Sequence, residues 1–428
     1  MPLGPSGDVA VGSADAGVSR DALGTTLVRT RCYFDPSDGV RLNEMRYQAI
    51  EIGRHALAAL VVSASLFGCG ASAPFKRLAS TDLRCGQMQL GTLRFVSPEV
   101  GWARGSWASH RAILRTIDGG RTWRNVTPPS IPAMLTGPVV TAFLNGTHAS
   151  IVGHESRRQD SVVLTSNGGL TWRRVLLEVA EGNNYAPYFA VVTFLGERTR
   201  WLDTIDTGMN ERIQRLYQTM DGGAHWQQIA SGLPICAILG FQTPSLGYGA
   251  DIEGGGGPSI VYRSGDGGRH WQPHPLSLPS IYRHVRVTVT FGPVQLRGHR
   301  TATLPAFIAP LDLHSHASLV VYRSDDGGLH WLRRAPLDLH SSAIDVDIAF
   351  ANVMDGWAIT NRGLYRTKDA GKTWGKINTN TKLRLGDAID FVTTRIGFTL
   401  RWMKDGQTLL RTNDGGRTWQ IVSGASFL

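Results

Sequence analysis

TIDGGRTW, residues 116–123, is the stretch that decides the fold, because seven versions of it occur along the 428-residue chain. The other six are TSNGGLTW (165–172), TMDGGAHW (219–226), SGDGGRHW (264–271), SDDGGLHW (324–331), TKDAGKTW (367–374) and TNDGGRTW (412–419). Their tryptophans follow one another at intervals of 49, 54, 45, 60, 43 and 45 residues. This period is too long for ankyrin or tetratricopeptide helices and suits a unit of four strands.

Each octapeptide has the chemistry of a tight hairpin turn. Its Asp or Asn can accept backbone N–H bonds from about two residues further on, and Gly supplies a positive φ without steric cost. The Trp then begins the next strand and buries its ring against a neighbouring sheet. In three copies His225, His270 and His330 replace the Thr before the Trp, and we interpret them as turn residues rather than ligands. The residues assigned this structural role are Asp118, Asn167, Asp221, Asp266, Asp326, Asp369, Asp414, Trp123, Trp172, Trp226, Trp271, Trp331, Trp374 and Trp419.

A second pattern precedes four of the turns. Phe95 is followed six and seven residues later by Gly101-Trp102, and the same spacing recurs at 241–248, 350–357 and 391–398. Alternating apolar residues before the octapeptides add another strand, so each repeat reads as strands A to D with the octapeptide between C and D. The 50 glycines agree, since Gly inside a helix costs about 1 kcal/mol relative to Ala. Twelve Trp and only 18% charged residues exclude a disordered chain.

The octapeptide matches the Asp-box, or bacterial neuraminidase repeat. Seven copies with the Gly-aromatic strand resemble the photosystem II stability/assembly factor-like family over about residues 86–425. This resemblance implies an all-β fold: a single seven-bladed β-propeller with four-stranded blades. In photosynthetic members of that family the implied client is a photosystem II assembly intermediate, but nothing in this sequence shows a photosynthetic source.

The chain before the repeats predicts export. Residues 56–67, ALAALVVSASLF, match the apolar region of a secretory signal and are too short to span a bilayer. They lead to Cys69, which resembles the lipid-modified cysteine of a bacterial lipoprotein, although Phe67 is bulkier than usual there. We therefore expect a membrane-anchored extracytoplasmic lipoprotein, with an ordinary cleaved signal (a secreted protein) or an uncleaved anchor as alternatives. The expected organisation is 1–44 as a start assigned too early or a disordered tail, 45–68 as the signal, 69–85 as a tether and 86–428 as the propeller.

The cysteines and the charge restrict the partners. In an oxidising compartment Cys85 and Cys236 could form a disulfide or remain two buried thiols, and no CxxC motif supports zinc or thioredoxin-like chemistry. The net charge of +10 and pI near 9.7 suit an acidic protein or polymer, or describe only a basic soluble surface. No Lys/Arg block is long enough for a nucleic-acid tail, so we expect no nucleic acid and no cofactor.

We expect function on the face opposite the octapeptides, where B–C and D–A connections lie. Residues 178–188 and 202–211 read as long loops of the second blade. His314 and His316, with Asp312, form either a metal site or a polar loop, and we assign no metal. The candidate binding residues are Tyr185, Tyr188, Asp203, Glu211, Arg212, His314 and His316.

Catalysis is not predicted. A sialidase needs three Arg to hold a carboxylate, a Tyr/Glu pair and an acid Asp, and its Phe/Tyr-Arg-Ile-Pro signature is absent before the first octapeptide. Xyloglucan-degrading relatives pair two propellers, whereas this chain has repeats for one. We expect a monomeric, non-catalytic scaffold that binds a protein or polymer. The alternative is a carbohydrate-active or sugar-binding propeller.

Overall fold

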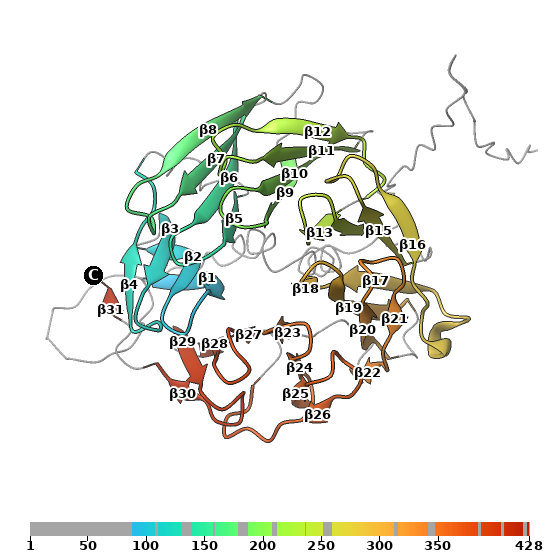
Figure 1. Cartoon of the computed structure of the whole chain (residues 1–428). Helices are drawn as coiled ribbons and strands as arrows, with labels where there is room; N and C mark the ends of the chain where they lie inside the picture. The colour runs from blue at the N-terminus through green and yellow to red at the C-terminus, as the bar shows by residue number, and fades with distance from the viewer. Residues whose placement is uncertain are drawn as a thin grey trace, which may run out of the picture.

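The computed structural model describes residues 88–427 except 108–109, 130–138, 157–158, 179–186, 208–211, 236, 251–258, 312–315, 341–346, 384–386, 404–405 and 423–425. Over these residues seven antiparallel sheets stand as blades around a ring, each with its first strand nearest the centre (Figure 1). The helical content of the described part is one 3-10 turn, η2 (Ser280–Tyr282). The predicted all-β, seven-bladed propeller is therefore confirmed.

The blades follow one another in chain order. Blade one comprises β1 (Met88–Phe95), β2 (Gly101–Trp107), β3 (His110–Thr116) and β4 (Thr122–Asn125). Blade two comprises β5 (Val139–Phe143), β6 (Ala149–Ser156), β7 (Gln159–Thr165) and β8 (Arg173–Glu178). Blade three comprises β9 (Pro187–Phe194), β10 (Arg200–Thr207), β11 (Arg212–Thr219) and β12 (Gln227–Ser231). Blade four comprises β13 (Ala237–Phe241), β14 (Gly247–Ala250), β15 (Ile260–Ser264) and β16 (Gln272–Pro275). Blade six comprises β23 (Asp347–Phe350), β24 (Gly356–Thr360), β25 (Gly363–Thr367) and β26 (Gly375–Lys376). Blade seven comprises β27 (Ala388–Phe391), β28 (Gly397–Met403), β29 (Gly406–Thr412) and β30 (Gln420–Ile421).

Blades five and one carry additions to the four-stranded plan. Blade five comprises β17 (Val287–Phe291), β18 (Gln295–Arg297), β19 (Thr301–Pro310), β20 (Ser318–Ser324), β21 (Leu332–Arg333) and β22 (Leu337–Asp338). Its outer edge is split, because β21 and β22 pair with different parts of β20. At the end of the chain β31 (Ser426–Phe427) pairs in parallel with β4 of blade one.

The hydrophobic cores lie between blades. Each cluster of buried side chains combines residues from two neighbouring blades, and the one containing Phe95, Trp123, Phe398 and Leu409 joins blade seven to blade one. A blade therefore buries its apolar faces only when both neighbours are present, which explains why the repeats stack into a closed ring.

The Gly-aromatic pattern builds these interfaces. Phe391 of blade seven stacks on Trp357 of blade six at 3.7 Å between ring centroids, and Phe95 stacks on Phe398 across the closure. Within blade seven the Phe391 ring covers Gly397, where an added Cβ would lie 2.6 Å from the ring. The glycine is needed because the ring of the preceding Phe occupies the space of its side chain.

Arginines at the ends of third strands connect blades as well. Arg115 of blade one donates from Nε to the carbonyl of Gly146 in blade two, and Arg263 of blade four donates to the carbonyl of Gly327 in blade five. Arg411 of blade seven reaches the carbonyl of Pro98 in blade one. These guanidinium groups are therefore engaged within the fold.

One prediction of local structure was wrong. Residues 202–211 do not form a loop of blade two, because β10 runs through Thr207 in blade three and only 208–211 lie between it and β11. Its polar residues suggested a loop, but Asp203 pairs with a polar partner inside the sheet. The predicted signal, the tether and all four cysteines (Cys32, Cys69, Cys85 and Cys236) lie outside the described residues. Among the described residues no helix has the length and apolarity needed to cross a membrane.

Candidate functional site

The octapeptide turns lie at one face, between the third and fourth strands of each blade. In the first, Asp118 accepts bonds from the backbone N–H of Thr122 at 2.9 Å and from the hydroxyls of Thr122 and Thr116 at 2.6 and 2.8 Å. Thr116 in turn accepts the N–H of Gly120. The carboxylate thus bridges to the fourth residue on, rather than the second as the sequence suggested. Its bonding capacity is used inside the turn.

The three turns with His in place of Thr follow the same plan. The Nδ1 atoms of His225, His270 and His330 lie 2.7, 2.5 and 2.6 Å from carboxylate oxygens four residues earlier. Partial burial opposes ionisation of Asp266, but hydrogen bonds from the backbone and ring of His270 outweigh it and lower the pKa to about 2. Each pair closes its own turn.

The opposite face carries the B–C and D–A connections, because each third strand ends at the octapeptide face. Of the predicted binding residues, Tyr185, Glu211 and His314 lie outside the described residues, and Tyr188 and Arg212 are placed only as backbone in β9 and β11. Asp203 was wrongly predicted to be on a binding loop, because its side chain is 2% exposed and accepts two 2.8 Å bonds from Nε2 of Gln214. His316 is exposed on this face, just before β20.

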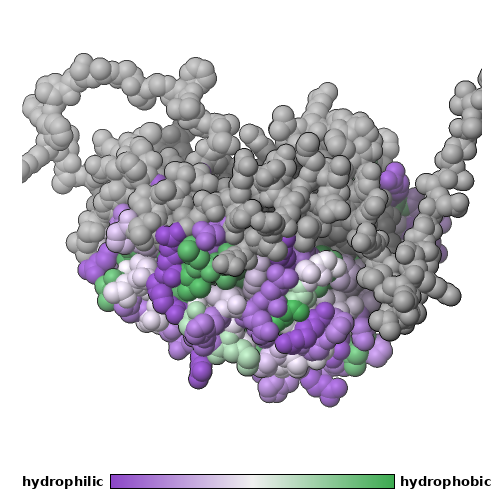
Figure 2. All heavy atoms as spheres, turned by 90° about the horizontal axis from the view of Figure 1, so that it is seen from above, coloured by the Kyte–Doolittle hydropathy of each residue, from purple (hydrophilic) through white to green (hydrophobic). Residues whose placement is uncertain are grey.

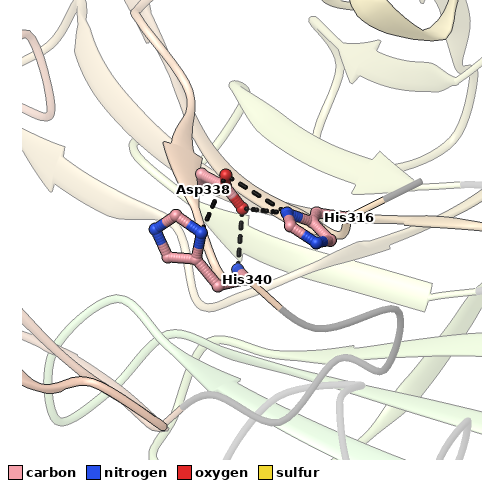
Figure 3. Close-up of side chains that lie close together, drawn as sticks. All are labelled: His316, Asp338 and His340. Atoms are coloured by element: carbon pink, nitrogen blue, oxygen red, sulfur yellow. Dashed lines mark hydrogen bonds and ion pairs between the residues drawn. The ribbon is translucent and has the colours of Figure 1, made fainter. Parts of the chain in front are cut away.

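His316 lies in a cluster with two residues that the sequence analysis missed. Nδ1 of His316 is 3.2 Å from Oδ1 of Asp338, and Nδ1 of His340 is 3.1 Å from Oδ2 of the same carboxylate. Figure 3 shows both rings directed at the Asp338 carboxylate from opposite sides. The potential ligand atoms all lie within 4.8 Å of one another. Two imidazole nitrogens and a carboxylate oxygen therefore lie close together on this face.

Pairing within blade five creates this cluster. Ser318 of β20 is opposite Asp338 of β22, and the N–H of Leu339 donates to the carbonyl of Ala317. The register brings the connection before β20 against the one after β22. A repeated hexapeptide could have revealed it: PLDLHS occurs at 310–315 and again at 336–341. His314 and Asp312 belong to the first copy, whereas Asp338 and His340 belong to the second.

Buried groups hold the cluster in position. The hydroxyl of Tyr282, a residue 2% exposed, donates to the carbonyl of His316 at 2.6 Å. His340 has a φ of 52°, and its N–H donates to Oδ1 of Asp338 at 2.7 Å. Partial burial opposes ionisation of Asp338, but this N–H and the two imidazoles outweigh it and hold the carboxyl pKa below its ordinary value. The group is thus a carboxylate at neutral pH.

Next to the cluster lies an exposed segment of mixed chemistry. Tyr282 belongs to η2. Ile281, just before it in the sequence, is 61% exposed, and Arg283 and His284, just after it, are also exposed. We call Ile281, Arg283, His284, His316 and His340 the blade-five patch. On the face drawn in Figure 2, the described residues are mostly hydrophilic, with small separate hydrophobic areas.

The fold and this face define a closed seven-bladed β-propeller with imidazole, guanidinium and apolar groups grouped opposite its octapeptide turns. No known family model matches the chain. No curated protein matches its sequence.

Solved structures of similar fold exist. One described as YCF48 bound to D1 peptide is 19% identical, with a TM-score of 0.46 over 77% of this chain and 94% of that chain. The uncharacterized protein lmo1340 of Listeria monocytogenes EGD-e is 8% identical, with a TM-score of 0.48 over 82% and 98% of the two chains. A PL25 ulvan lyase is 9% identical, with a TM-score of 0.45 over 76% and 90%. At these identities the likeness concerns the fold alone.

Proposed function

We propose that this chain is a non-catalytic, extracytoplasmic scaffold, tethered to the membrane through Cys69, that binds a partner through the face opposite the octapeptide turns. The partner is an acidic protein or another acidic polymer. The observation that carries the proposal is the blade-five patch, in which Ile281 and Arg283, before and after the buried Tyr282, are both exposed. Arginine is enriched in protein-binding surfaces, and an exposed apolar side chain on the same segment offers surface that a partner can bury.

The octapeptide face also exposes apolar side chains, among them Ile117 and Met220, but many of its polar groups are already bonded within the fold. At the octapeptide face the carboxylates of residues such as Asp118 and Asp266 accept hydrogen bonds from N–H groups of their own turns. The arginines at the ends of third strands, such as Arg115 and Arg263, donate hydrogen bonds to carbonyls of the next blade. In the blade-five patch, by contrast, Ile281, Arg283 and His284 are exposed next to Tyr282, whose buried hydroxyl bonds to the carbonyl of His316. Binding there therefore orders little additional chain.

The positive net charge of the chain favours association with an acidic partner. A net charge of +10 attracts an acidic surface from a distance, and the effect weakens as salt shortens the screening length to about 8 Å at physiological ionic strength. A photosystem II assembly intermediate, the client that the sequence resemblance implies, would be one specific partner of this kind.

Photo-crosslinking from a single position tests the binding face. A photoreactive residue replaces Ile281 in one full-length chain and Leu329, 44% exposed in an octapeptide turn, in a control chain. We expect native membranes to give a discrete crosslinked protein from position 281 only, weakened by the Arg283→Glu change and by high salt. Crosslinking only from position 329, or turnover of a fluorogenic sialoside or glucan by the chain, contradicts the proposal.

The tether has a separate test. Mass spectrometry of the chain isolated from membranes should find Cys69 as the lipid-modified N-terminal residue. An unmodified, internal Cys69 removes the tether and leaves the scaffold proposal to the crosslinking result.

A further inference from the structure

We propose that His316, Asp338 and His340 form a binding site for a divalent transition-metal ion of the zinc class. The ligands are Nδ1 of each imidazole and an oxygen of the carboxylate. The site lies on the face opposite the octapeptides, where the connection before β20 meets the connection after β22. It is independent of the identity of the partner proposed above.

The spacing of the cluster differs from that of ordinary His–Asp pairs in this chain. In the octapeptide turns the His Nδ1 atom and the Asp oxygen lie in direct contact, at 2.5–2.7 Å. Around Asp338 the Nδ1 atoms of His340 and His316 lie 3.1 and 3.3 Å from the same oxygen, Oδ2, further away than in any of those turns. Ligands bound tetrahedrally at about 2.0–2.1 Å are about 3.3 Å from one another. The two separations to Oδ2 therefore fit the edges between ligands around one ion.

The donor set selects the class of ion. Imidazole nitrogens suit zinc and the neighbouring transition metals, whereas calcium and magnesium prefer oxygen ligands. Three protein ligands are the usual complement of a zinc site that keeps one position open. His316 and Asp338 are about half exposed, at 54% and 49% of their side chains, so water or a group from a bound molecule can take the fourth position.

The scaffold around the donors limits the rearrangement that binding requires. Buried Tyr282 holds the backbone of His316, and the β20–β22 pairing fixes Asp338 opposite Ser318. The side-chain amide of Asn361 in blade six reaches the carbonyl of His340. An ion would tie these segments together within the blade-five patch, to which His316 and His340 belong, and so set the geometry that a partner meets.

Cobalt(II) titration of the full-length, chelator-treated chain tests the site, because tetrahedral Co²⁺ absorbs visible light. We expect saturable d–d absorption from one bound equivalent, displaced by Zn²⁺. His316→Ala, Asp338→Asn and His340→Asn should each weaken binding at least tenfold, in line with the loss of one ligand. Asn is chosen at position 340 because it tolerates the positive φ there.

Two controls make the result decisive. His330→Ala removes one His of a close His–Asp pair at the opposite face and should leave the titration unchanged. Each variant must retain the far-ultraviolet spectrum and thermal transition of the unchanged chain. The proposal is overturned if folded wild-type chain gives no saturable absorption, if the three ligand variants bind like wild type, or if a sulfur-to-cobalt charge-transfer band shows that cysteines hold the ion.

Discussion

At the residue scale, the sixth octapeptide shows how strictly the turn restricts its members. Ala370 occupies the position of the first turn glycine, with a φ of 58° and no exposed surface. In the seventh turn Gly415 has a φ of 75°, and an added Cβ would lie 2.7 Å from the guanidinium of Arg366 in the preceding blade. In the blade before Ala370, the equivalent Arg323 donates to the Asp325 carboxylate and to the sulfur of Met354. An alanine is therefore tolerated where the neighbouring arginine is held elsewhere.

The first prediction compares these two positions. Gly415→Ala should cost at least about 1–2 kcal/mol of unfolding free energy, because a non-glycine residue in the left-handed region is strained and its Cβ displaces Arg366. Ala370→Gly should change stability by less than about 0.5 kcal/mol, because relief of strain is offset by a lost methyl contact and by a more flexible unfolded chain. Urea denaturation measures both, and equal effects at the two positions would refute the arginine explanation.

The second prediction concerns acid. Partial burial opposes ionisation of Asp414, but the hydroxyl and N–H of Thr418 outweigh it and lower the pKa to about 2. A carboxyl with a lowered pKa stabilises the fold above its ordinary pKa near 4, and this contribution is lost as the pH falls from about 4 to 2. Unfolding free energy should therefore decrease over that range. Asp414→Asn should lose part of this pH dependence, since Asn167 forms the equivalent bonds to Thr171 without a carboxylate.

Denaturation at pH 5, 3 and 2 measures this dependence in the variant and in the unchanged chain. Parallel curves for the two chains would show that the turn carboxylate does not contribute to acid sensitivity.

Residue patterns predicted only part of the candidate site. His316 was found from its spacing to His314, because a local motif is visible along the chain. Asp338 and His340 are 22 and 24 residues further on and approach His316 only through the register of β20 and β22. Asp203 was wrongly predicted to lie on a loop, because polar residues are typical of loops. Its buried hydrogen-bond partner Gln214, which explains its place inside the sheet, cannot be recognised from the sequence.

At the element scale, the two recurring motifs predicted the blades because each encodes one interface. The octapeptide marks the turn between third and fourth strands, and the Gly-aromatic pair starts the second strand and supplies a ring to the next blade. The split edge of blade five and the strand β31 have no motif, and neither was predicted. Pro336 lies where that edge is interrupted, between β21 and β22, and proline cannot donate a ladder hydrogen bond.

The third prediction tests the junction of β27 with β1. Asp390, 6% exposed, accepts the N–H of Phe95 at 2.8 Å and the guanidinium of Arg94 at 2.9 Å. Asp390→Ala leaves that buried N–H without its acceptor and should cost about 2–3 kcal/mol. Asp355→Ala, which breaks a pair with Arg366 inside blade six, should cost less.

Hydrogen exchange at Phe95 separates the two variants in this third test. The amide should lose protection in Asp390→Ala and keep it in Asp355→Ala. Unchanged exchange at Phe95 in both would show that this hydrogen bond does not hold the closing junction.

At the scale of the whole molecule, stability depends on closing the ring, and besides the hydrogen bonds of Asp390 two further features of the closure can be compared. One is the side-chain core between blades seven and one, where Phe95 stacks on Phe398 at 3.4 Å between centroids. The other is the short parallel pairing of β31 with β4, which joins Ser426 to Thr122 and Phe427 to Trp123. The core buries large apolar side chains, whereas β31 adds two residue pairs at the outer edge. The core should therefore contribute most of the closing energy.

Two truncations decide between these contributions, and they form the fourth prediction. A chain ending at Val422 loses β31 and should remain a cooperatively unfolding monomer, less stable by about 1–2 kcal/mol for the few hydrogen bonds removed. A chain ending at Lys382 loses blade seven, which exposes the faces of Phe95 and Trp357 that it covers, so it should lose its cooperative transition and self-associate. Thermal unfolding and light scattering compare the two chains. If the loss of β31 alone abolishes cooperative folding, then the terminal strand closes the ring, and the interblade core is not sufficient.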